Sequence, residues 1–112
     1  MNSGSFSTPP QRIVSQLLEE DADLRDIVEQ FVEALPVRLE ELRQAHETLD
    51  WDQLTTLAHR LKGASGSYGY PDLSAIAAEM EKAFRAHSGD DCADWFARIE
   101  AYVQAAQAGL DG

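Results

Sequence analysis

The sequence predicts an all-α fold, an antiparallel bundle of four long helices with a short N-terminal helix that caps one end. Three observations support this prediction. Apolar residues recur at spacings of three and four, no stretch alternates with a period of two, and Gly and Pro are scarce between Gln11 and Gly63. A chain of 112 residues has room for one domain, which we place at residues 11–109.

The first twenty residues divide into a tail and a short helix. Residues 1–10 are predicted to be a flexible tail, because Ser, Gly, Thr and Pro predominate there. A helix is expected from Gln11 to about Glu20, with four apolar residues on one face: Ile13, Val14, Leu17 and Leu18. The acidic residues at its end fit a solvated turn rich in capping side chains: Glu19, Glu20, Asp21 and Asp23.

A longer helix is expected next, because nine apolar residues follow one another at helical spacing: Leu24, Ile27, Val28, Phe31, Leu35, Leu39, Leu42, Ala45 and Leu49. Pro36 lies inside this run. Because proline lacks a backbone donor and crowds the preceding turn, we expect it to kink the helix.

A third helix is expected to start after Asp50, which is placed as its N-cap. Gln53 follows three residues later, as in a capping box, and Leu49 and Leu54 are placed as a hydrophobic staple. The helix should stop near Gly69. Its predicted apolar face consists of Leu54, Leu57, Ala58, Leu61, Ser65 and Tyr68.

Two further helices complete the predicted bundle. Pro71 is well placed as the first residue of a fourth helix, whose apolar face holds Leu73, Ile76, Ala77, Met80 and Phe84. A turn over residues 87–90 precedes a fifth helix, which should end at Gly109. The apolar face of the fifth helix holds Phe96, Ile99, Val103 and Ala106.

Charge and cysteine content limit the possible partners. Twenty acidic and nine basic residues give a net charge of −11, and the pI is about 4.4. Such a surface repels phosphate backbones and anionic lipids, so we expect no nucleic-acid or membrane partner. The single cysteine, Cys92, excludes an internal disulfide and fits a reducing compartment. We therefore expect a cytoplasmic monomer.

The polar face of the third helix is unusual. Advancing by about 100° per residue places five residues opposite the apolar face: Thr55, Thr56, His59, Gly63 and Gly66, here called the histidine face. Long charged side chains normally cover such a surface, yet every neighbour of the histidine on this face is small. Arg60 and Lys62 lie at its two edges and add local positive charge to an acidic chain.

Gly63 stands four residues after His59 and is therefore its direct neighbour on the helix surface. A glycine inside a helix costs roughly 0.5–1 kcal/mol relative to alanine. We interpret the missing side chain as a feature that leaves room for another protein to dock over the imidazole.

The segment His59–Gly69, HRLKGASGSYG, resembles the H-x-L-K-G-x-S-x-x-x-G signature of histidine-containing phosphotransfer (HPt) domains. The similarity extends over roughly residues 13–105. It implies a four-helix bundle that carries a phosphoryl group on His59, with Lys62 beside that group. It also implies that Glu81, on the next helix, hydrogen-bonds the non-reacting nitrogen of the imidazole.

The resemblance also implies the partners of the chain. These would be the receiver domains of a hybrid sensor kinase and of a response regulator, whose aspartates exchange the phosphoryl group with His59. The receiver would supply Mg²⁺, so this chain would need no cofactor or metal of its own and would have no kinase activity. The residues of the histidine face, and Arg60 at its edge, are expected to contact the receiver. A neutral imidazole is a competent nucleophile at physiological pH.

Other functions are compatible with parts of the sequence. The main alternative is a helical interaction module whose histidine is never phosphorylated, because an open face favours docking in both cases. A small-molecule enzyme is disfavoured, since the sequence indicates no cleft, no catalytic arrangement of two carboxylates and no Gly-rich phosphate loop. A metal site made from His46, His59 and His87 is disfavoured because their spacing does not suggest one.

Overall fold

The computed structural model describes residues 12–111, and within this range the all-α prediction is confirmed. The predicted tail, residues 1–10, lies outside the described residues. The elements in chain order are α1 (Gln16–Glu20), the 3₁₀ turn η2 (Ala22–Leu24), α2 (Arg25–Glu47), α3 (Trp51–Ser67), α4 (Pro71–Arg85) and α5 (Cys92–Asp111).

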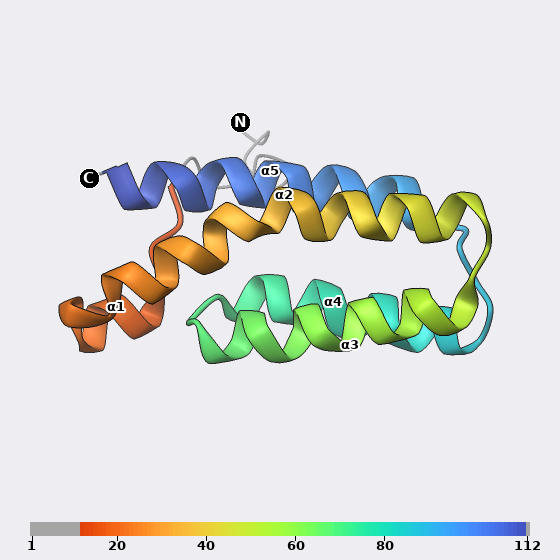
Figure 1. Ribbon diagram of the computed structural model, residues 1–112, viewed down its shortest axis with the longest axis horizontal. Coiled ribbons are helices and arrows are strands. Elements are labelled where there is room, and N and C mark those ends of the chain that lie inside the picture. Colours follow the sequence, from red (N-terminus) through yellow and green to blue (C-terminus); the bar gives the residue numbers. More distant parts are fainter. Residues whose placement is uncertain (1–11, 112) are drawn as a thin grey trace, which may run out of the picture.

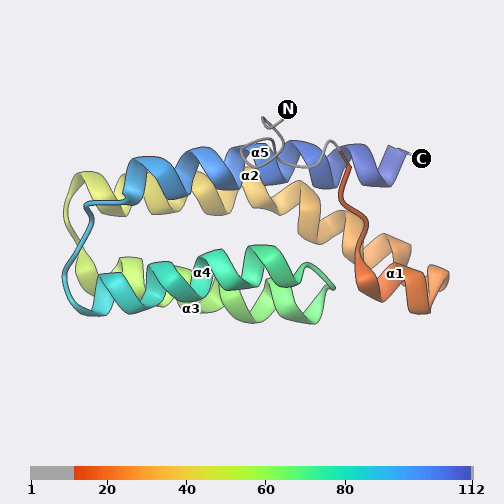
Figure 2. The same ribbon diagram turned by 180° about the vertical axis from the view of Figure 1, so that it is seen from behind.

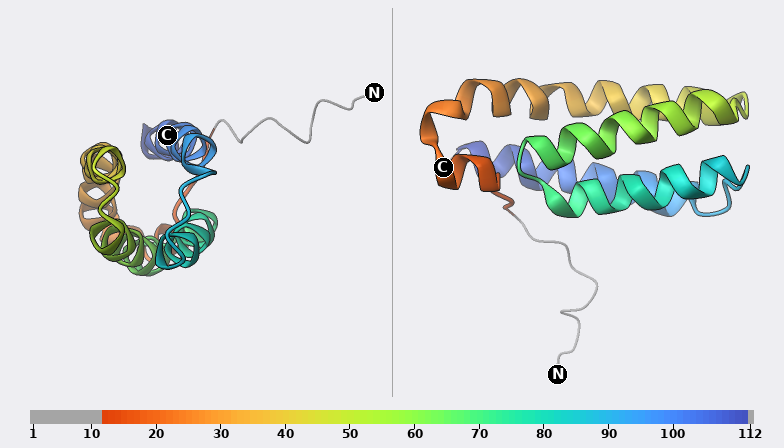
Figure 3. Two further views of the ribbon diagram at one scale, coloured as in Figure 1. Left: turned by 90° about the vertical axis from the view of Figure 1, so that its right-hand side faces the viewer. Right: turned by 90° about the horizontal axis from the view of Figure 1, so that it is seen from below.

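The four long helices lie side by side, and each runs opposite to the one before it (Figure 1). α2 lies next to α5 and α3 lies next to α4, and the α3–α4 contact is the most extensive in the molecule. Seen end-on, the helices form a ring in the order α2, α3, α4, α5 (Figure 3). Each helix therefore turns one apolar face toward a shared core, and α5 lies diagonally across from α3.

α2 largely follows its predicted pattern. Val28 and Leu42 are almost completely buried, as is Val32, which the pattern omitted. Ile27, in contrast, is 41% exposed. The helix continues through Pro36 and changes direction in its middle part, as the missing backbone donor predicts (Figure 1).

The first helix is shorter than predicted, because Ser15 caps it. Ser15 Oγ accepts hydrogen bonds from the N–H groups of Leu17 and Leu18, at 3.1 and 3.4 Å. This cap fixes the start of α1 at Gln16, so residues 12–15, here called the strap, are not helical. At the other end of α1, the Asp21 side chain accepts the Asp23 N–H and caps the η2 turn.

The strap joins two distant parts of the bundle. Its Ile13 N–H donates to the carbonyl of Ala105 in α5 at 2.9 Å. Ser15 Oγ donates to the carbonyl of Tyr68, which lies in the turn between α3 and α4. Figure 2 shows the strap, which begins beside α5 and runs down to the start of α1.

Two glycines permit the close approach of this N-terminal segment. Gly69 has φ +85°, and a Cβ there would lie 2.6 Å from Ser15 Oγ. Gly109 was predicted to end the fifth helix, but it lies inside α5. A Cβ at Gly109 would lie 2.8 Å from the carbonyl carbon of Ile13. The prediction was wrong because this glycine accommodates the strap rather than a helix end.

The turn into α3 forms only part of the predicted capping pattern. The Asp50 carboxylate accepts the N–H of Gln53 at 3.1 Å, as predicted. The Asp50 N–H donates to the Ala45 carbonyl at 3.0 Å and so is not used in a capping box. Leu49 adopts φ +52° and is 56% exposed, so the predicted staple with the buried Leu54 is absent.

The core also contains residues from the loops and from the start of α5. Tyr70, in the loop between α3 and α4, is fully buried, and its ring centroid lies 5.9 Å from that of Phe31. Cys92 is almost completely buried, and burial, followed by the charge of Asp91, raises the pKa of its thiol. Trp95 is buried, with its ring edge-on to Phe84.

Gly109→Ala tests the contact between the strap and α5. We expect it to lower the free energy of unfolding by about 1–3 kcal/mol, because the added methyl group must displace backbone atoms of the strap. Gly63→Ala is the matched control, since nothing lies within 4 Å of a Cβ at that position. It should raise stability by up to about 1 kcal/mol. Thermal melts measure both, and an unchanged melting temperature for Gly109→Ala would contradict this packing.

Candidate functional site

His59 lies in the middle of α3 on the side that faces away from the core. Ala58 and Leu61, its neighbours on the apolar face, are 0% and 2% exposed. Because these residues anchor α3 to the core, the helical period turns His59 outward, and its side chain is 62% exposed. The imidazole is therefore accessible to a second protein.

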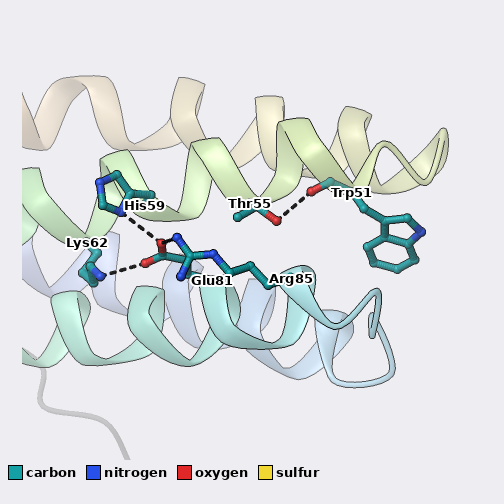
Figure 4. Close-up of polar contacts among 6 residues, drawn as sticks. All are labelled: Trp51, Thr55, His59, Lys62, Glu81 and Arg85. Carbon is teal, nitrogen blue, oxygen red and sulfur yellow. Dashed lines mark hydrogen bonds and ion pairs between the residues drawn. The ribbon is translucent and has the colours of Figure 1, made fainter.

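Glu81 of α4 is placed beside this imidazole. Its side chain is only 5% exposed, and its Oε2 lies 3.0 Å from His59 Nδ1 (Figure 4). An ionised carboxylate can only accept a hydrogen bond, so Nδ1 carries the ring proton and donates a hydrogen bond to Oε2. The lone pair of the neutral ring then resides on Nε2, which has no partner among the described residues.

Two cations share the Glu81 carboxylate with His59. Lys62 Nζ lies 2.7 Å from Oε1, and an Arg85 guanidinium nitrogen lies 2.7 Å from Oε2. Lys62 was predicted to belong to the site, and the structure brings it to Glu81. Arg85 was not predicted, although its position four residues after Glu81 on one helix is the spacing of an ion pair.

These contacts keep Glu81 ionised although it is buried. The hydrogen bond from Lys62 is the largest influence and lowers the pKa of Glu81, while burial acts in the opposite direction. The hydrogen bond from His59 and the charges of Arg85 and Lys62 lower the pKa further. A buried carboxylate is tolerated when charged and hydrogen-bonded partners compensate its lost hydration, as they do here.

The other residues of the histidine face differ in their surroundings. Gly63 is exposed, and its position borders open space. At Gly66 a Cβ would meet Ser74 Oγ of α4 at 3.5 Å, so this glycine lies at the seam between the two helices. Thr56 is exposed, whereas Thr55 is half-buried and donates its hydroxyl to the Trp51 carbonyl at 2.8 Å (Figure 4).

Hollows lie on two sides of the histidine face. A groove of about 410 Å³ between α2 and α3 is lined by Arg60 together with the apolar side chains of Val37 and Leu57. A second hollow, of about 430 Å³, follows the seam between α3 and α4. The charged residues that line it are Lys62, Glu81, Lys82 and Arg85.

The local charge at the site differs from that of the whole chain. Four of the nine basic residues lie on α3 and α4: Arg60, Lys62, Lys82 and Arg85. The chain as a whole carries −11. A protein that presents an acidic or phosphorylated pocket is therefore attracted to these two helices more than to the rest of the surface.

The remaining histidines lie in other surroundings. The His46 ring is edge-on to Phe96, and the His87 ring stacks on Trp51 with centroids 5.5 Å apart. Over residues 12–111, no group of three or more His, Cys, Asp or Glu side chains is arranged to hold a metal ion. Over the same residues, no helix combines the length and the apolar character that crossing a membrane requires.

In a comparison with known protein families, residues 26–109 match the family model described as the Hpt domain. The matched segment covers three quarters of the chain and includes His59, Lys62, Glu81 and Arg85. It begins after the strap and α1. No curated protein and no solved structure matched the sequence in two further comparisons.

Glu81→Gln tests the stability that the ionised carboxylate contributes. The pKa of Glu81 lies below its ordinary value of 4.5, so the ionised carboxylate makes its full contribution to the free energy of unfolding above pH 4.5. The contribution is lost as the pH falls through the lower pKa of the folded chain. We therefore expect the wild type to melt higher than the variant near pH 7, and the difference to shrink below about pH 4.5. Glu79→Gln, at an exposed position of α4, is the control. A difference that did not change with pH would contradict this assignment.

Proposed function

The chain belongs to the Hpt domain family, and we propose that it accepts a phosphoryl group on His59 from the aspartate of one receiver domain and passes it to the aspartate of another. Family membership supports histidine phosphotransfer within a phosphorelay in general. The single observation that carries the finer proposal is an exposed imidazole whose Nδ1 is held by a buried carboxylate. This arrangement presents Nε2 as the nucleophile.

In the proposed transfer, His59 Nε2 attacks the phosphorus of an aspartyl phosphate. The N–P bond forms while the bond from phosphorus to the aspartate oxygen breaks, and the aspartate leaves as a carboxylate. The imidazole keeps its Nδ1 proton, so the phosphorylated ring carries a positive charge. Glu81 Oε2 accepts the Nδ1 hydrogen bond throughout and stabilises that charge. Transfer to the next receiver reverses these steps.

Lys62 is proposed to move between two acceptors. Its side chain is 37% exposed and lies three residues after His59, on the same side of α3. In the resting chain it pairs with Glu81 Oε1 at 2.7 Å. When a phosphoryl group is present on Nε2, the ammonium group can turn to its oxygens, where it neutralises charge during transfer.

The receiver is proposed to dock over the histidine face, where Gly63 leaves the approach to His59 open and Thr56 is exposed. Arg60, at the edge of this face, and the basic residues of the seam complement the acidic phosphorylation pocket of a receiver. The Mg²⁺ needed for transfer would arrive with the receiver. All groups of the proposed site come from one chain, so a monomer suffices. Hpt domains are phosphocarriers rather than kinases, and we propose the same for this chain.

An interaction module without phosphorylation is the second candidate, because an open face also fits simple docking. The Glu81 contact favours the phosphocarrier. A buried carboxylate that orients one imidazole nitrogen adds nothing to docking, whereas it directly serves a nucleophile on the other nitrogen.

His59→Gln tests the identity of the acceptor. The variant should remain helical, because the side chain is exposed, yet it should take no phosphoryl group from a receiver domain phosphorylated with acetyl phosphate. The measurement is an acid-labile, base-stable label on the wild-type chain. His87→Gln is the control and should be labelled like the wild type. Label on His59→Gln at the wild-type level would exclude His59 as the carrier and favour the interaction module.

Gly63→Gln tests the docking surface separately from the fold. The added side chain enters open space on an exposed helix, so the free energy of unfolding should rise by up to about 1 kcal/mol. It also stands one turn from His59, so transfer from the receiver should slow at least about tenfold, or about 1.4 kcal/mol. Gly63→Ala should gain stability with a smaller loss of transfer rate. Thermal melts measure the change in stability, and transfer kinetics measure the change in rate. An unchanged transfer rate for Gly63→Gln would show that the receiver does not dock over the histidine face.

A further inference from the structure

Arg85 has so far been counted only among the basic residues of the seam, yet it binds the same carboxylate oxygen as His59. We propose that Arg85 is a positioning residue, the counter-ion that keeps Glu81 ionised and bound to Nδ1 while His59 carries the phosphoryl group. This inference rests on the proposed function of His59.

The geometry gives each carboxylate oxygen of Glu81 its own cation. Oε1 pairs with Lys62, and Oε2 pairs with Arg85 while it also accepts the His59 Nδ1–H. The Glu81 side chain is 5% exposed, so little water is available to replace a cation that leaves. The ionised state of Glu81 therefore depends on how many of these partners remain in place.

The two cationic side chains come from different helices and differ in flexibility. Lys62 comes from α3, the helix of His59, and its flexible ammonium group can turn toward a phosphoryl group on Nε2. Arg85 comes from α4, one turn after Glu81, and its guanidinium stays charged at any pH of interest. Figure 4 shows Lys62 and His59 on one side of the carboxylate and the Arg85 side chain extending to it along α4. Arg85 is therefore the cation that remains when Lys62 turns away.

Formal charges show why a second cation is useful. When the imidazole is neutral, as attack by Nε2 requires, Lys62, Arg85 and Glu81 together carry +1 beside it. Phosphorylation adds about −2 on the phosphoryl group and +1 on the ring, which leaves the cluster near neutral. Without Arg85 the same cluster would change from neutral to about −1. A buried carboxylate in a cluster of net negative charge disfavours the phosphorylated state.

Arg85 contributes little to folding by comparison. Its side chain is 67% exposed, and exposed ion pairs within one helix add little to stability because water and salt screen them. A residue with only a structural role would change the melting temperature. Arg85 should instead change the phosphorylation equilibrium, and the effect should weaken as the ionic strength rises.

The experiment measures the phosphoryl equilibrium between the full chain and a receiver domain that has been phosphorylated with acetyl phosphate and freed of reagent. Arg85→Gln should lower the ratio of phosphorylated to unphosphorylated chain about fivefold at low salt, with a smaller effect near 1 M salt. Arg85→Lys should restore the ratio to within about twofold of the wild type. Arg98→Gln removes the same charge from an exposed i, i+4 ion pair with Asp94 on α5, away from the histidine face, and should also stay within about twofold.

A second measurement reports on the position of the proton. Imidazole nitrogen chemical shifts of the phosphorylated chain should show the Nδ1–H hydrogen bond in the wild type and its weakening in Arg85→Gln. An Arg85→Gln variant with the wild-type ratio would overturn the inference, as would an equal loss in Arg98→Gln. In both cases a labelled wild type leaves the proposed function intact. A wild type that takes no label from the receiver would overturn the proposed function and this inference together.

Discussion

A buried negative charge constrains this fold more than any other single interaction. Among residues 12–110, Glu81 is the one acidic residue that is buried, and burial of an unpaired carboxylate would cost several kcal/mol. Its charge is compensated mainly by Lys62 and His59 of α3, and further by Arg85, which lies one turn after Glu81 on α4. The relative placement of the two helices and the orientation of the imidazole are therefore set by the same requirement.

The rest of the bundle holds α3 and α4 in this register. Ser74, in the first turn of α4, donates its hydroxyl to the Lys62 carbonyl at 2.9 Å, directly beside the site. At the end of α3, Gly69 reverses the chain and accepts the N–H of Gln16 on its carbonyl, while Tyr70 fills the core beneath the turn. Gln16 of α1 and Ser15 of the strap, whose hydroxyl donates to the Tyr68 carbonyl, thus support the turn that joins the two helices of the site, although both residues lie outside the segment matched to the Hpt family.

The sequence was informative where local patterns determine structure. Helical periodicity correctly identified the buried residues of α3, which are Leu54, Ala58, Leu61 and Ser65. The resemblance around His59 indicated Lys62 and Glu81, which lie together with His59 in the structure. The strap, the position of Gly109 within α5 and the burial of Tyr70 were not predictable, because each depends on segments that meet only in the folded chain. Arg85 was visible as an i, i+4 partner of Glu81, but many such pairs lie on a helix surface, and only the burial of Glu81 makes this one distinctive.

The burial of Cys92 has a practical consequence for studying this protein in solution. It is the only cysteine of the chain, and it lies in the core with 1% exposure and a raised thiol pKa. Maleimides and spin labels react with accessible thiolates, so the native chain offers them almost no target. A cysteine introduced at a surface position would become the single labelling site. Fluorescent or paramagnetic probes can therefore be attached around the bundle without first removing the native thiol.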